Sequence, residues 1–145
     1  MIINIILICV WTLYMLCEGG RESIFFHFST FTTKPLKTNY HSLFLIQRTL
    51  VFGAFVLCIW LNTQSWILLL LIGFGLIFIS PFFHDGMYYY MRNVIDEIYP
   101  KGFLDQTTDT TGSSAAWSSK YETAIARIIY LGIGLLLLVL SFILF

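Results

Sequence analysis

The sequence predicts an all-α integral membrane protein with four transmembrane helices and an additional interfacial amphipathic helix after the third span. Of the 145 residues, 58% are hydrophobic and only 11% are charged, whereas a soluble domain typically has about 25% charged residues. Four separate apolar segments are each long enough to cross most of a bilayer core. A chain this short has too little interior to hide so much apolar surface from water. We therefore expect lipid to be its solvent.

The four predicted spans cover residues 1–17, 43–61, 66–83 and 125–145, and together they form a single transmembrane domain over 1–145. The first segment lacks the basic n-region and the small-residue cleavage site of a signal peptide, so we expect a retained helix. Only four residues separate the second and third spans, which predicts a tight antiparallel hairpin. The glycine pairs Gly73/Gly75 and Gly132/Gly134 are expected to permit close helix approach.

The two long polar segments, 18–42 and 84–124, must lie on one side of the membrane if all four spans are crossed. These segments and their flanks hold every basic residue, namely Arg21, Lys34, Lys37, Arg48, Arg92, Lys101, Lys120 and Arg127. The short hairpin and both termini hold none. The positive-inside rule therefore predicts cytoplasmic long loops and both termini outside.

Residues 83–99 are predicted to form the additional amphipathic helix, lying along the inner membrane surface. Pro100 should end it, because the residue before a proline avoids the α region. We expect its apolar side chains to be buried in lipid or against the bundle, in particular Met87, Tyr90, Val94 and Ile98. Its opposite face carries polar side chains, namely Asp85, Tyr89, Arg92, Asn93, Asp96 and Glu97.

Charged and polar side chains converge at the cytoplasmic boundary of the predicted bundle: Glu18, Arg48, His84, Asp85 and Arg127. A charge near the centre of a span costs roughly 2.5–3.5 kcal/mol. Arg48 either snorkels to lipid phosphates or pairs within the bundle, with Glu18 at a similar depth. Counting residues from the hairpin turn predicts that Arg48 and His84 reach the same polar pocket, with Glu18 or Asp85 nearby as counter-charge.

Two kinds of chemistry are conceivable at this boundary. His84 and Asp85 are candidates for acid–base catalysis. A headgroup- or ion-pair cluster of Glu18, Arg48, Arg92 and Arg127 would suit a phosphate, because arginine binds phosphate with paired hydrogen bonds. The alternative for residues 84–93 is an interfacial helix anchored by its tyrosines.

A metal site is not predicted, although histidines with carboxylates can bind metals. Its candidate ligands are His27, His41, His84 and Glu22, which match no known ligand spacing, and no cofactor is predicted. The alternative is unrelated interfacial histidines. Three cysteines with no zinc spacing are expected to be small buried hydrophobic residues, and these are Cys9, Cys17 and Cys58.

Three functions remain open, and the sequence leaves undecided whether the protein is an enzyme. The absence of a soluble domain and of any catalytic motif favours a non-enzymatic subunit, anchor or scaffold of a membrane complex. The alternative is a small membrane enzyme acting on lipid headgroups or phosphates at the cytoplasmic face. A transporter or channel component is third, and Asn4, Thr12 or Ser141 would then line its pore. The bilayer is the expected partner, followed by other membrane subunits or a homo-oligomer. Nucleic acid is not expected, because no basic face is present.

Overall fold

The computed structural model describes residues 2–31, 40–95, 102–104 and 123–144, and these contain helices but no strand. The four helices are α1 (Ile2–Phe31), α2 (Tyr40–Thr63), α3 (Trp66–Ile95) and α4 (Ala124–Ile143). Each is long and apolar enough to cross a membrane. Thr123 caps α4, since its side chain accepts a hydrogen bond of 3.2 Å from the Ala126 amide.

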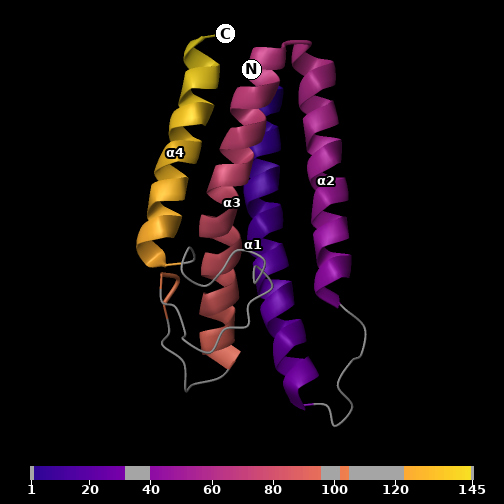
Figure 1. The fold of residues 1–145 in the computed structure, drawn as a ribbon, viewed down its shortest axis with the longest axis vertical. Coiled ribbons are helices and arrows are strands. Elements are labelled where there is room, and N and C mark those ends of the chain that lie inside the picture. Colours follow the sequence, from indigo (N-terminus) through magenta and orange to yellow (C-terminus); the bar gives the residue numbers. More distant parts are fainter. Residues whose placement is uncertain (1, 32–39, 96–101, 105–122, 145) are drawn as a thin grey trace.

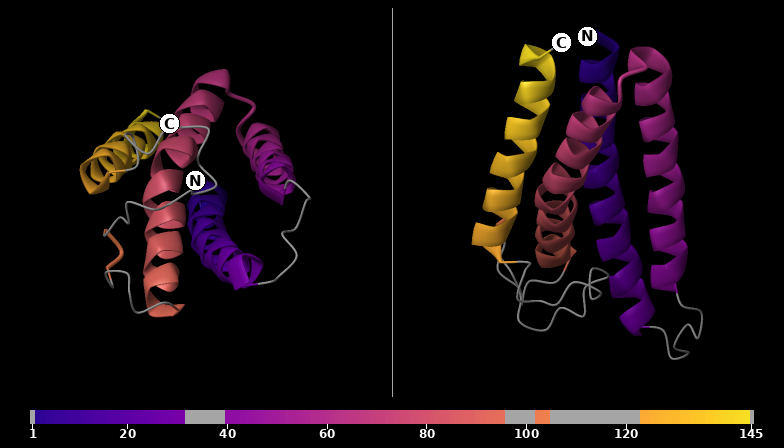
Figure 2. Two further views of the ribbon diagram at one scale, coloured as in Figure 1. Left: turned by 60° about the horizontal axis from the view of Figure 1, so that its bottom comes forward. Right: turned by 45° about the horizontal axis from the view of Figure 1, so that its top comes forward.

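Helix α3 is the centre of the bundle, with α1 and α4 packed along it and α2 standing further out (Figures 1 and 2). In its most apolar stretch, 33% of the α3 residues are buried, against 6% in α2. Both chain ends and the α2–α3 turn lie at one end of the bundle in Figure 1. The C-terminal ends of α1 and α3 therefore share the other end with the N-terminal ends of α2 and α4.

The hairpin between α2 and α3 turns at Gln64, whose φ of 48° lies in the left-handed region. The rings of Trp60 and Trp66 pack beside the turn in a tilted arrangement, with centroids 4.2 Å apart. Asn62 donates a hydrogen bond of 2.9 Å to Asn4, which ties this end of α2 to α1. The tight hairpin predicted from the sequence is present.

Close approach of α3 and α4 depends on one glycine of each pair. A Cβ on Gly134 would lie 2.9 Å from the Gly75 carbonyl oxygen, and a Cβ on Gly75 would lie 2.7 Å from Leu138. Gly73 and Gly132 would meet nothing within 4 Å. The expected role in helix packing thus holds for Gly75 and Gly134 alone.

The first polar loop is shorter than predicted, because α1 continues through residues 18–31 and α2 begins at Tyr40. Two features favour helix beyond Cys17. Glu18 and Arg21 form an ion pair of 2.6 Å one helical turn apart. Gly19 packs directly on α3, so tertiary contact outweighs the low helix propensity of Gly19 and Gly20.

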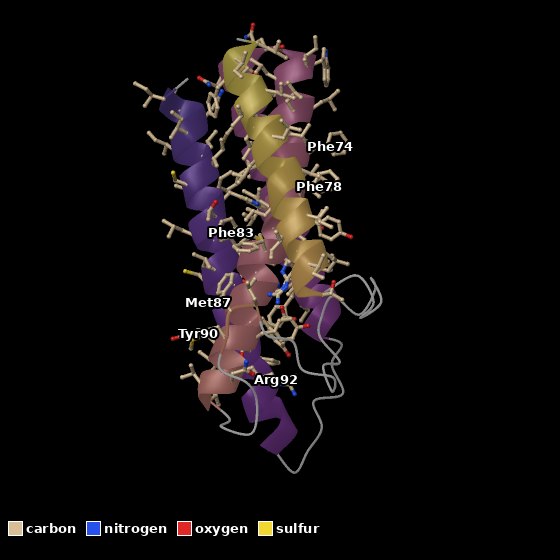
Figure 3. All side chains as sticks on the ribbon, turned by 90° about the vertical axis from the view of Figure 1, so that its left-hand side faces the viewer. Phe74, Phe78, Phe83, Met87, Tyr90 and Arg92 are labelled. Carbon is tan, nitrogen blue, oxygen red and sulfur yellow. The ribbon has the colours of Figure 1, made fainter. Side chains whose placement is uncertain are left out.

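The predicted separate amphipathic helix is instead the C-terminal part of α3, which passes Pro81 and continues to Ile95. The polar side packs into the bundle, and Asp85, Tyr89, Arg92 and Asn93 are all buried. Tyr90 and Val94 are exposed, Met87 contacts α1 beside Gly20, and Ile98 lies outside the described residues. Figure 3 shows Tyr90 and Arg92 on opposite sides of α3.

The cysteines are also placed differently from the prediction, because Cys9, Cys17 and Cys58 are all exposed. They lie on the outer surfaces of α1 and α2. Their apolar surroundings predict burial, but much of the exterior of the described helices is apolar as well. Hydropathy therefore does not distinguish inside from outside.

Candidate functional site

The site begins with two glutamates on α1. Glu18 and Glu22 are four residues apart, so they lie on the same face of the helix. Gly19 brings this face against α3, since a Cβ there would lie 2.1 Å from the His84 carbonyl oxygen. Glu18 is 3% exposed and Glu22 is 1% exposed, so both carboxylates require partners inside the bundle.

Arg48 of α2 supplies that partner. Its guanidinium pairs with Glu22, and its Nε lies 3.6 Å from Glu18 Oε1. The same guanidinium lies 2.7 Å from His84 Nε2, which confirms the predicted meeting of Arg48 and His84. We call Glu18, Glu22, Arg48, His84 and Asp85 the ionic cluster. It joins three helices, with Arg48 as the contribution of the otherwise loosely packed α2.

His84 has a partner on each ring nitrogen. Nδ1 lies 2.7 Å from Asp85 Oδ1, and Nε2 lies 3.1 Å from Glu22 Oε2. A neutral ring with its proton on Nδ1 accepts a hydrogen bond from Arg48 at Nε2, whereas an imidazolium donates from Nε2 to Glu22. His84 can therefore hold or release a proton at Nε2 and remain hydrogen-bonded in either state.

Among the described residues, the charges of the cluster together with Arg21 are close to balanced. Three carboxylates, Glu18, Glu22 and Asp85, face two guanidiniums, because Arg21 also pairs with Glu18 at 2.6 Å. The sum is −1 with a neutral His84 and zero with an imidazolium. A buried group of ions needs such balance, since each unpaired charge in a low dielectric costs several kcal/mol.

An open cavity of about 680 Å³ lies beside the cluster, lined mainly by α2 and α3 with contributions from α1 and α4. Its lining includes Trp11, Met15, Leu45, Arg48, Thr49, Phe52, Phe74, Ile77, Phe78, Ser80, Pro81, His84, Asp85 and Tyr130. Arg48, His84 and Asp85 are the lining residues that belong to the ionic cluster. Glu18 and Glu22, the other two members of the cluster, do not line the cavity. The volume falls within the roughly 300–1,000 Å³ typical of small-molecule sites.

Trp11 holds the inner wall of the cavity in place. Its Nε1 donates hydrogen bonds to the Leu76 carbonyl at 3.2 Å and to Ser80 Oγ at 3.0 Å. Its ring packs edge-on against Phe52 and Phe55 of α2, with centroids 5.4 and 5.3 Å away. One side chain thus spaces α2 from α3 beside the ionic cluster.

Of the four residues predicted as one headgroup or ion-pair cluster, the structure shows Glu18 and Arg48 in contact and gives Arg127 other partners. Glu18 and Arg48 pair, whereas Arg127 donates to the carbonyls of Phe103 and Leu104 at 2.9 and 2.8 Å. The Arg127 guanidinium also lies over the Tyr89 ring, 5.3 Å from its centroid. Arg92 is buried two turns beyond His84, about 12 Å along α3.

No group of three or more metal-binding side chains occurs within the part of the chain that the structure describes. Of the candidate ligands, Glu22 and His84 contact each other in the ionic cluster. The side chains of His27 and His41 lie outside the described residues.

Sequence reasoning missed the central position of Glu22. It was considered only as a metal ligand, because the first span was ended at Cys17. The spacing of Glu18 and Glu22 would have indicated a shared face if α1 had been extended by two turns. Phe103 was also missed: its ring occupies the space that a Cβ on Gly86 would need.

These features define an all-α protein with four helices able to span a membrane and a charged cluster beside an apolar cavity. Comparison with protein-family models, curated proteins and solved structures gave no match.

Proposed function

We propose that this protein is an integral membrane protein that binds a lipid-like amphiphile between α2 and α3. The polar end of the ligand would lie at Arg48, His84 and Asp85, and its chain along the apolar lining. The observation that carries the proposal is the cavity itself, whose walls are apolar and whose charged lining residues belong to one cluster. Such a division of polar and apolar surface matches an amphiphile.

Arg48 is suited to meet the polar end. Its side chain is 22% exposed, whereas those of Glu18 and Glu22 behind it are 3% and 1% exposed. The two carboxylates hold the guanidinium in place, so little side-chain entropy remains to be lost when a ligand binds. Ordered donors in an apolar cavity also interact more strongly than they would in water.

The proposed topology has both termini outside and the long loops in the cytoplasm. Arg48 lies 15 residues before Thr63, which corresponds to about 22 Å along α2. With the hairpin at the outer boundary of a hydrocarbon core about 30 Å thick, Arg48 lies about 8 Å inside the cytoplasmic boundary. The ligand's polar end would then be drawn slightly below the level of the headgroups. The exposed Tyr90 and Val94 side of α3 would face the cytoplasmic interface.

Cysteine labelling tests this topology. The native cysteines are replaced first, because Cys9, Cys17 and Cys58 are exposed. A cysteine introduced at Gln64 should react with an impermeant maleimide on intact cells, and one at Thr108 only after permeabilisation. The reverse pattern would contradict the proposed orientation.

Ligand binding is tested with a photoactivatable single-chain amphiphile and the purified protein in detergent. Thr49→Trp fills the cavity without removing a charge, and we expect it to reduce crosslinking at least tenfold. Arg48→Gln should do the same by removing the polar contact. Arg21→Gln is the matched control, because Arg21 contacts the cluster but does not line the cavity. Equal crosslinking of the wild type and Thr49→Trp would contradict the proposal.

An enzyme acting on a lipid headgroup is the second candidate function. It is supported by His84, which has hydrogen-bond partners in both protonation states and lines the cavity with Asp85. In that case His84 would be the acid or base. The cleft that an enzyme would need is the same cavity, so amphiphile binding is the requirement common to both proposals.

A subunit or scaffold in a membrane complex is supported by a different observation. Helix α2 is the least buried of the four, and a partner helix would find most of its apolar surface available. A channel has less support, because Asn4 accepts from Asn62, while Thr12 and Ser141 donate to the Ile8 and Leu138 carbonyls.

A further inference from the structure

Resting on the proposed function, we infer that the polar end of the bound amphiphile is uncharged and that the ligand is a lipid alcohol such as a monoacylglycerol. The inference comes from the charges that the ionic cluster presents to the cavity. It departs from the expectation that the arginines of this protein hold a phosphate.

The cations of the cluster are already paired. Arg48 contacts Glu18 and Glu22, while His84 contacts Asp85 and Glu22. Among the described residues, with Arg21 included, three carboxylates against two guanidiniums give no surplus positive charge, even with His84 protonated. A phosphate entering the cavity would therefore add negative charge beside a cluster whose cations are already neutralised.

The cavity lining carries one charge of each sign, so it gives no net attraction to a charged head of either sign. Asp85 contributes a carboxylate to the lining, which would repel a phosphate. Arg48 contributes a guanidinium to the same lining, which would repel an ammonium group.

A hydroxyl group avoids both conflicts. It carries one donor and two acceptor positions, so it can donate to Asp85 and accept from Arg48 without disturbing either ion pair. A glycerol head provides two such hydroxyls. The single chain of a monoacylglycerol would lie along Phe52, Phe74 and Phe78, which line the apolar part of the cavity.

The experiment compares three probes with the same acyl chain length on the purified full-length protein in detergent: a monoacylglycerol, a lysophosphatidic acid and a long-chain primary amine. Binding is measured by native mass spectrometry, with competition against the photoactivatable amphiphile. We expect the monoacylglycerol to bind at least tenfold more tightly than either charged probe. Asp85→Asn should reduce the difference in affinity between the monoacylglycerol and lysophosphatidic acid, because the carboxylate that repels the phosphate is removed.

The outcomes separate this inference from the proposed function. If no probe binds in a manner that Thr49→Trp abolishes, the proposed amphiphile site itself is wrong. If binding is abolished by Thr49→Trp but lysophosphatidic acid or the amine binds most tightly, the site stands and the uncharged head is wrong. The wild-type ranking alone decides this, so the inference remains testable if Asp85→Asn does not fold.

Discussion

Substituting Gly19 by alanine is expected to destabilise the bundle by about 3 kcal/mol or more, the upper part of the range for overpacked sites. The added methyl would lie 2.1 Å from the His84 carbonyl oxygen and 3.1 Å from the Tyr88 amide nitrogen. Both are backbone atoms of α3 and cannot rotate away. Helix α1 must therefore move outward, which also withdraws Glu18 and Glu22 from His84. The measurement is unfolding of the purified protein in detergent, followed by tryptophan fluorescence.

Gly73→Ala and Gly132→Ala are the matched controls, because both glycines are helical and a Cβ on either would meet nothing within 4 Å. Alanine has the higher helix propensity by up to about 1 kcal/mol. These variants should therefore be as stable as the wild type or slightly more so. If Gly19→Ala unfolds at the same point as the two controls, α1 and α3 do not approach as closely as described.

Replacing Arg48 by methionine is expected to lower the free energy of unfolding by about 3–5 kcal/mol. This is the destabilisation that follows when one partner is removed from a buried group of ions. Methionine retains much of the length and apolar contact of the stem. The change leaves Glu18 and Glu22 buried beside His84 and Asp85 with their principal cation gone. It also removes the ionic contact of α2 with the rest of the bundle. The same unfolding assay measures the loss, and Arg48→Lys should recover part of it.

Arg21→Met provides the comparison for this change. Arg21 also pairs with Glu18, but its side chain is 45% exposed, and ion pairs at such positions contribute about 1 kcal/mol or less. We therefore expect Arg21→Met to change the free energy of unfolding only slightly. Equal effects at Arg21 and Arg48 would show that Arg48 snorkels outward rather than joining the ionic cluster.

The apolar segments and the hairpin could be predicted because each depends on local composition and length. A run of about 20 apolar residues favours helix in any fold that excludes water, since its backbone groups must bond internally. The contact between Arg48 and His84 could also be predicted from the sequence. A hairpin places residues at similar distances from its turn at similar depths, and arginine is long enough to close the remaining gap.

The helix ends and buried faces could not be predicted in the same way. Residues 18–31 are polar enough for a loop, and they are helical because Gly19 packs on α3 and Glu22 finds Arg48 and His84. In the C-terminal part of α3, the packing against α1 and α4 decided that the polar side faces into the bundle. Asp85 and Asn93 face inward, whereas Tyr90 and Val94 face outward.

The amino-acid sequence by itself determined four apolar helices, the hairpin between the second and third, and the charges gathered near one end. The tertiary structure alone decided which of those charges are partners and which helix faces are buried. The physical reason is that hydropathy describes a residue's preference for an apolar environment, and in this bundle the interior and the exterior are both apolar. Partners such as Glu22 and Arg48, or Arg127 and the Phe103 carbonyl, are selected by close packing and by the requirement that buried charges be neutralised.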